Sequence, residues 1–107
     1  MSARMQGGSL SVAGLVAELN KSCREKLLEG RDLKNLVKIF EDAELMTTLN
    51  CLFENDLNVS KTARALYMHR NTLIYRLDKV RSITGLNPDS FNDAVTFLIL
   101  YALYCAK

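Results

Sequence analysis

Apolar residues recur three and four positions apart along most of the chain, which is the spacing of amphipathic helices. Stripes of this kind cover residues 12–28 and the segments that follow Asp32 and Asp42. The two aspartates are suited to cap helices, because their side chains accept an otherwise unpaired N–H of the first turn. Gly30 is placed to end the first helix, because glycine adopts the left-handed C′ conformation at little cost. Few β-branched alternations appear, so strands are not expected.

After a turn at residues 55–58, the pattern predicts two short helices joined by a tight turn. Ser60 is expected to cap the first helix, and Ala63 supplies the small side chain needed where the two helices cross closely. The chain then turns through residues 67–69, and the second helix is expected to end at Gly85. Together these elements predict a helix-turn-helix at about residues 58–85.

The second of these helices has two different sides. On a wheel of 3.6 residues per turn, the apolar residues Leu73, Leu77 and Val80 fall close together. The opposite side, with its flanks, carries mostly polar and aromatic residues: Asn71, Thr72, Ile74, Tyr75, Asp78 and Ser82. We therefore expect the helix to bury one side and leave the other free.

A final helix is expected from Phe91 to about Cys105, and it is apolar on nearly every side. Ser90 and Asp93 resemble a capping box at its start. A helix of this composition is either the central helix of a core or part of a subunit interface. The apolar stretch is shorter than a membrane span of roughly 20 residues, so no membrane association is expected.

These elements predict an all-α domain of about five helices, and 107 residues suffice for one small domain with one core. Residues 1–9 are interpreted as a flexible lead-in or a tag outside the fold. Residues 10–107 are interpreted as one helical domain. No apolar segment follows the N-terminal residues, so no signal peptide is expected.

The charge is distributed unevenly along the chain. The net charge of the whole chain is +2. Between Asn58 and Gly85 there are six basic residues and one acidic residue, a net charge of +5, whereas the remainder has eight basic and eleven acidic residues, a net charge of −3. A polyanion would be attracted to the basic segment.

Three widely spaced cysteines, Cys23, Cys51 and Cys105, include no C-x-x-C pair. They are interpreted as reduced, buried thiols that act as small core hydrophobes in a cytosolic protein. One histidine cannot build a histidine-rich metal site, and no cofactor is expected. No carboxylate pair, nucleophile–base pair or glycine-rich phosphate loop is visible, so an enzyme is not expected.

Four polar residues, His69 to Thr72, stand at the start of the second helix. In a helix-turn-helix this end enters the major groove of DNA, where arginine pairs with guanine and asparagine with adenine. Thr72 can donate to a phosphate or touch a thymine methyl, and the start of the first helix lies where phosphates would pass. The predicted DNA-binding residues are Ser60, Lys61, Thr62, His69, Arg70, Asn71, Thr72, Ile74, Tyr75, Arg76 and Lys79.

Several of these residues have structural alternatives. His69 either only caps its helix or also donates to a phosphate. Tyr75 either faces DNA or packs at an edge of the fold. Arg76 lies near the core side, where it either contacts a phosphate or pairs with a carboxylate of the same chain. Arg70 and Asn71 could also be merely solvated residues at a helix start.

The segment from Asn58 to Leu77, NVSKTARALYMHRNTLIYRL, closely resembles the C-terminal helix-turn-helix of the PucR and sugar-diacid (CdaR) type of bacterial transcription regulators. The pattern A-x-x-L-x-x-H-R-N-T-L-x-Y-R-L, followed by TGLNP and an apolar helix, carries the resemblance, which extends from about Phe40 to Tyr104. The segment is more distantly similar to the Fis-type nucleoid protein, whose turn usually holds glycine where this chain has Tyr67. The resemblance implies a Fis-like helix-turn-helix that binds DNA.

The resemblance also implies partners. Fis-like relatives dimerise through helices ahead of the reading unit, and the apolar stripes at 12–28 and 42–53 could serve this purpose in a homodimer. Operators would then be nearly palindromic. In the PucR type the domain usually follows a signal-sensing region. The sequence is therefore expected to be either a fragment of a regulator whose sensor domain lies outside this chain, or a short stand-alone regulator.

The sequence thus predicts a transcription regulator that binds duplex DNA sequence-specifically, with a recognition helix at about 70–84 in the major groove. We expect it in the cytoplasm, associated with the nucleoid. The alternative is a helical oligomerisation or protein-interaction module that has lost DNA binding, which the apolar last helix and the modest total charge of +2 favour. The +5 segment discriminates between them, because an interaction module does not require positive charge at the recognition helix.

Overall fold

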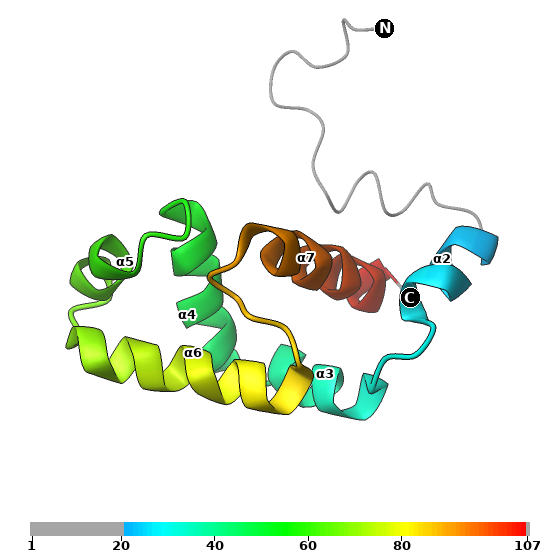
Figure 1. The fold of residues 1–107 in the computed structure, drawn as a ribbon, viewed down its shortest axis with the longest axis horizontal. Coiled ribbons are helices and arrows are strands. Elements are labelled where there is room, and N and C mark those ends of the chain that lie inside the picture. The colour runs from blue at the N-terminus through cyan, green and yellow to red at the C-terminus, as the bar shows by residue number, and fades with distance from the viewer. Residues whose placement is uncertain (1–20, 107) are drawn as a thin grey trace, which may run out of the picture. The chain divides into compact units, whose positions relative to one another are not determined.

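The structure is a computed structural model, which describes residues 21–106. These residues form six helices and no strand (Figure 1). The helices are α2 (Lys21–Leu28), α3 (Leu33–Phe40), α4 (Ala43–Glu54), α5 (Val59–Ala65), α6 (Arg70–Thr84) and α7 (Phe91–Ala106). The prediction of a small all-α domain is confirmed, with six helices where about five were expected. The part of the first predicted helix at residues 12–20 lies outside the described residues.

Local capping rules set most of the helix ends. Asp32 accepts a hydrogen bond from the backbone N–H of Asn35 at 3.2 Å, and Asp42 accepts one from the N–H of Leu45 at 3.1 Å. Both caps are as predicted. Gly85 ends α6 with a φ of 78°, which is the left-handed conformation expected of a glycine at this position.

The start of α7 differs from the prediction. Asp93 does not close a capping box with Ser90, because its carboxylate accepts the backbone N–H of Asn87 at 2.9 Å instead. Pro88 is fully buried in the same connection. The Asp93 carboxylate therefore binds the backbone of the loop before α7 and not the backbone N–H of Ser90.

The described residues fall into two compact units, one of residues 32–97 and one of residues 21–31 with 98–106. In the first unit, Phe97 of α7 is 1% exposed. Its ring centroid lies 5.3 Å from that of Phe40 in α3 and 6.1 Å from that of Phe53 in α4. Such edge and tilted contacts between rings add to the free energy gained by burying them. The start of α7 is thus part of the core of this unit.

The apolar side of α4 is buried in the same core. Leu45, Met46, Leu49 and Leu52 are all at most 7% exposed. The stripe at 42–53 was considered above as a dimerisation surface. This part of the expectation is corrected, because side chains that already pack inside their own domain are not available to a second copy.

The cysteines also differ from the prediction of three buried thiols. Cys23 and Cys105 are exposed, and Cys51 is partly exposed. Cys23 lies on α2, which buries none of its residues, so its position in an apolar stripe does not take it into a core. The Cys51 sulfur lies 3.4 Å from the Asn55 amide nitrogen at the end of α4.

Candidate nucleic-acid interface

The first helix of the predicted helix-turn-helix begins two residues earlier than a cap at Ser60 would place it, at Val59 instead of Lys61. Asn58 is the N-cap of α5, and its side-chain oxygen accepts the N–H of Lys61 at 2.9 Å. The cap at Ser60 is therefore wrong. Ser60 lies inside the first turn of α5, and Asn58 accepts one of the N–H groups that this turn leaves unpaired. Asparagine is as good a cap as serine, so the sequence held two candidates. As a result, the Ser60 side chain is exposed and free of a capping role.

Thr62 differs more strongly from the prediction of a DNA contact. The residue is 0% exposed, and its hydroxyl donates to the backbone oxygen of Asn58 at 2.8 Å. One turn of helix separates the two residues, so the bond satisfies the buried hydroxyl within α5. This threonine belongs to the interior of the domain, and its side chain is not at the surface that would meet DNA.

The turn between α5 and α6 is tight. Met68 donates its backbone N–H to Ala63 at 2.9 Å, and Tyr67 donates to Arg64 at 3.1 Å. Ala63 is 4% exposed, as expected of a small residue where two helices cross. Tyr67 has a φ of 53°, so a bulky residue occupies the left-handed conformation that glycine takes more easily.

His69 is the N-cap of α6, as predicted. Its ring nitrogen Nδ1 accepts the backbone N–H of Asn71 at 3.0 Å. Because Nδ1 acts as the acceptor, the ring proton of the neutral side chain is assigned to Nε2. The exposed His69 thus caps the helix with one nitrogen and keeps a donor on the other.

The two sides predicted for α6 are confirmed. Leu73 is 0% exposed, Val80 1% and Leu77 5%. Tyr75 is 72% exposed, so it does not pack at an edge of the fold. The other exposed residues on the free side are Arg70, Asn71, Thr72, Asp78, Lys79 and Ser82, and Ile74 is half-buried beside them.

Hydrogen bonds and ion pairs divide the basic residues of this region into two groups. Arg76 pairs with Glu44 of α4 at 3.0 Å and donates to the Thr48 hydroxyl at 3.4 Å. Of the two alternatives for this arginine, the structure has the intramolecular pair. Arg70 is held differently, since its Nε donates to the Ser60 hydroxyl at 3.3 Å and no carboxylate among residues 21–106 forms an ion pair with it.

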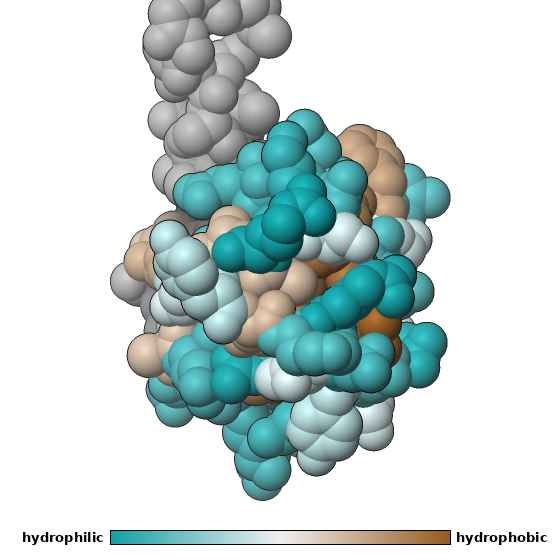
Figure 2. Space-filling model, turned by 90° about the vertical axis from the view of Figure 1, so that its left-hand side faces the viewer, coloured by the Kyte–Doolittle hydropathy of each residue, from teal (hydrophilic) through white to brown (hydrophobic). Residues whose placement is uncertain are grey.

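The predicted positive charge remains on the exposed surface of α5 and α6. Within residues 21–106, no carboxylate forms an ion pair with Lys61, Arg64 or Lys79. Further along α6, Arg81 forms an ion pair with Asp78 at 3.2 Å, so the two charges offset each other. In Figure 2 the side of the molecule that carries α5 and the start of α6 faces the viewer. The side chains on this face are mostly hydrophilic. The surface combines hydrogen-bond donors with unneutralised charge, which suits a polyanion.

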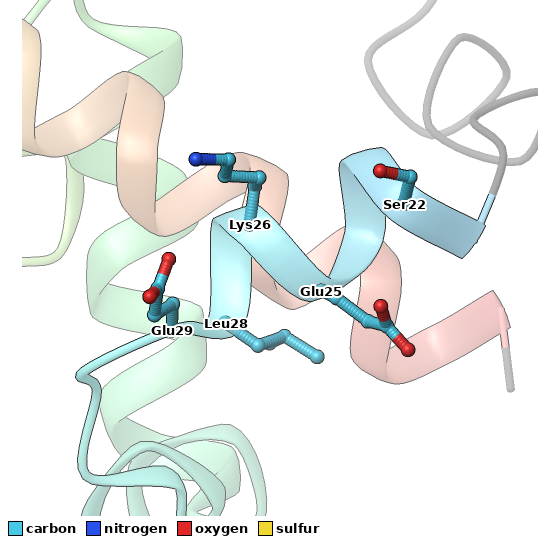
Figure 3. A pocket seen from close by; sticks show the side chains of 5 residues that line it. All are labelled: Ser22, Glu25, Lys26, Leu28 and Glu29. Atoms are coloured by element: carbon cyan, nitrogen blue, oxygen red, sulfur yellow. The ribbon is translucent and has the colours of Figure 1, made fainter.

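A second surface feature lies outside this region. A shallow depression beside α2 is lined by Ser22, Glu25, Lys26, Leu28 and Glu29, which all come from one helix and the residue that follows it (Figure 3). Over the described part of the chain, no three potential ligands come together to hold a metal ion. None of the helices at residues 21–106 is both long enough and apolar enough to cross a membrane.

Two helices that cross at a small residue, with the start of the second exposed and its opposite side buried, define a helix-turn-helix domain. Residues 45–103 match the PucR C-terminal helix-turn-helix domain. This match covers more than half of the 107 residues, and the chain belongs to this family of helix-turn-helix domains. The resemblance to the PucR and CdaR type of regulator that was read from the sequence is confirmed.

The chain is also similar in sequence to two regulatory proteins and to an uncharacterised protein. The chain is 44% identical over 69 residues to the uncharacterised protein YsfB of Bacillus subtilis (strain 168), covering 64% of this chain and 18% of YsfB. It is 47% identical over 45 residues to the purine catabolism regulatory protein of the same organism, covering 42% of this chain and 8% of that protein. It is 37% identical over 71 residues to the carbohydrate diacid regulator of Escherichia coli (strain K12), covering 66% of this chain and 18% of that protein.

The matched segment therefore spans less than a fifth of each of these relatives. The comparison with solved structures gave no match.

Proposed function

We propose that this chain binds duplex DNA sequence-specifically and regulates transcription, with α6 inserted by its N-terminal end into the major groove. One observation carries the proposal: the start of α6 presents Arg70, Asn71 and Thr72 to solvent, while Leu73 and Leu77 hold the helix on the core. A rigid helix that exposes base-reading groups at its tip is the arrangement that DNA-reading helix-turn-helix domains use.

Each group at the tip has a role in this proposal. The Arg70 guanidinium can pair with the O6 and N7 acceptors of guanine, and the Asn71 amide can pair with N6 and N7 of adenine. Thr72 contacts a phosphate or a thymine methyl. Ile74 and Tyr75 follow on the free side of the helix, where they form apolar contacts with the groove.

The residues around the tip fix the position of the helix on the backbone. Lys61 of α5 and Lys79 of α6 are exposed cations that neutralise phosphates, and the exposed Ser60 hydroxyl in the first turn of α5 also meets the backbone. His69 donates from Nε2, the nitrogen that its capping bond leaves free. We leave Thr62 and Arg76 out of this contact set, because one is buried and the other is paired with Glu44.

The role of the whole protein is proposed from its relatives. Two of the similar proteins are named as a purine catabolism regulatory protein and a carbohydrate diacid regulator. We infer that this chain supplies a DNA-binding rather than a catalytic function, in the cytoplasm at the nucleoid. We also infer that it acts as a homodimer on nearly palindromic sites, with signal sensing by a domain outside this chain.

The proposal is tested by selection from a duplex pool with a randomised core of about 20 base pairs, which spans two half-sites one helical turn apart. We expect enrichment of one motif in two inverted copies, and binding that weakens steeply as salt is raised. Enrichment of no sequence, or retention that ignores salt, would contradict the proposal and favour a protein-interaction module. One unrepeated motif would contradict only the homodimer.

Variants of the full chain separate the assigned roles. Arg70→Ala and Asn71→Ala should weaken binding to the selected duplex by roughly 5- to 150-fold each, and binding to a scrambled duplex much less. Lys61→Ala should weaken binding to the selected and to the scrambled duplex by the same factor, and lower the slope of log affinity against log salt by about 1. Lys26→Ala, an exposed lysine on α2, is the matched control and should change neither. Equal losses from all the tip variants on both duplexes would overturn the roles.

A further inference from the structure

One hydrogen bond joins the starts of the two helices of the helix-turn-helix. The Nε of Arg70, the first residue of α6, donates to the hydroxyl of Ser60 in the first turn of α5 at 3.3 Å. Ten residues separate the two, so the bond spans the turn rather than a single helix. Both side chains are exposed, and this bond contributes little to the stability of the fold. What the bond does is restrain the direction of the Arg70 side chain.

The chemistry of the two groups leaves their remaining donors free. A guanidinium has five N–H donors, of which Nε carries one and the two terminal nitrogens carry four. The bond to Ser60 uses the Nε donor, so the terminal pair stays available for a planar, bidentate acceptor such as the O6 and N7 edge of guanine. The hydroxyl accepts in this bond, and therefore its own proton still needs an acceptor.

We propose that Ser60 is a positioning residue for Arg70, which couples a phosphate contact to the reading of guanine. The Ser60 hydroxyl donates its proton to a phosphate oxygen of the DNA backbone while it accepts Nε–H of Arg70. The serine thus ties the register of α5 on the backbone to the direction of the reading side chain. This inference deepens the proposed function and rests on it.

The physical benefit lies in the cost of ordering a long side chain. A free arginine samples many rotamers, and fixing a flexible side chain on binding opposes affinity. A restraint already present in the unbound protein removes part of this cost for the guanine contact. It does not change the interaction of the charge with distant phosphates, so the gain is selective for the correct base. Loss of the hydroxyl should therefore lower discrimination and not only affinity.

The test pairs a change in the protein with a change in the DNA. The probe is the duplex enriched from the randomised pool, together with copies in which each guanine in turn is replaced by 7-deazaguanine, which lacks the N7 acceptor. The wild-type chain should lose about tenfold in affinity at the guanine that Arg70 contacts, in the range of a lost bidentate pair. Arg70→Ala should abolish this sensitivity and so identify the guanine.

Ser60→Ala should reduce the discrimination at that guanine to about threefold, because the arginine is then less restrained. Ser60→Thr keeps the hydroxyl and should restore the wild-type ratio. Ser82→Ala makes the same chemical change at an exposed serine far along α6, and should leave the ratio unchanged. Thermal unfolding of each variant checks that the exposed substitutions leave the fold intact.

The outcomes separate this inference from the proposed function. If Ser60→Ala lowers the affinity for all duplexes by the same factor and keeps the tenfold ratio, the serine is a phosphate contact only and the coupling is wrong. An unchanged affinity and ratio would also overturn it. If the wild-type chain enriches no duplex, the proposed function itself fails. A ratio that falls in Ser60→Ala and returns in Ser60→Thr supports the coupling.

Discussion

Arg76 of α6 and Glu44 of α4 form an ion pair at 3.0 Å across 32 residues of sequence. The arginine side chain is 26% exposed and the glutamate 74%, so water screens the pair on one side. Thr48, a buried residue of α4, accepts a second hydrogen bond from the same guanidinium. These contacts hold the middle of α6 against α4, behind the tip that is proposed to meet DNA.

We expect Glu44→Gln to lower the free energy of unfolding by at most about 1 kcal/mol, because the glutamate is 74% exposed and water screens its charge. Arg76→Ala should cost more, since it also removes the packed stem and the bond to Thr48. Neither change should alter the salt dependence of DNA binding at a temperature where the domain is folded. Urea unfolding and binding at several salt concentrations check both points. A salt slope lowered by about 1 in Arg76→Ala would instead make Arg76 a phosphate contact.

The cap of α5 distinguishes Asn58 from Ser60. Asn58→Ala should destabilise the domain by about 1 kcal/mol, because the N–H of Lys61 loses its acceptor. Ser60→Ala should change the free energy of unfolding by less than about 0.5 kcal/mol, as is usual for an exposed side chain. Urea denaturation measures both values. The reverse order of the two effects would return the capping role to Ser60.

Tyr67 occupies a left-handed conformation with 97% of its surface exposed. Tyr67→Gly should stabilise the domain by about 1 kcal/mol, because glycine adopts a positive φ without the clash of a Cβ. Such a gain raises the Tm of a domain of this size by roughly 4–8 °C. Tyr75→Gly is the matched control, since Tyr75 is exposed inside α6, where glycine should lower stability by roughly 0.5–1 kcal/mol. A lower Tm for Tyr67→Gly would contradict the strain.

Two phenylalanines of α7 have opposite environments. Phe97 is 1% exposed against Phe40 and Phe53, whereas Phe91 is 72% exposed. Phe97→Ala should cost about 3–5 kcal/mol by leaving a cavity in the core. Phe91→Ala should cost less than about 0.5 kcal/mol, as usual for a surface position. Thermal or urea unfolding compares the two. Similar losses for both would mean that Phe91 is covered in solution.

The sequence was sufficient for the features that depend on neighbours within a turn or two of helix. The caps at Asp32, Asp42 and His69 follow from side chains two or three residues before a free N–H. The stop at Gly85 follows from the freedom of glycine at positive φ. The period of the apolar residues likewise identified the buried side of α6. These rules depend only on residues close in sequence, so they can be applied before any tertiary contact is known.

Two kinds of feature could not be predicted from local patterns. One is the choice between residues that are equally suited to the same local role, and the other is a contact between residues distant in sequence. Asn58 and Ser60 are both residue types that cap helices, but only Asn58 caps α5, and Thr62 of the same helix is buried. The pairing of Arg76 with Glu44 joins two helices that no local pattern relates. Local patterns were thus enough to predict the helices and the polar tip of α6. The tertiary structure decided which polar groups that tip keeps free, because burial and long-range pairing depend on which helices pack together.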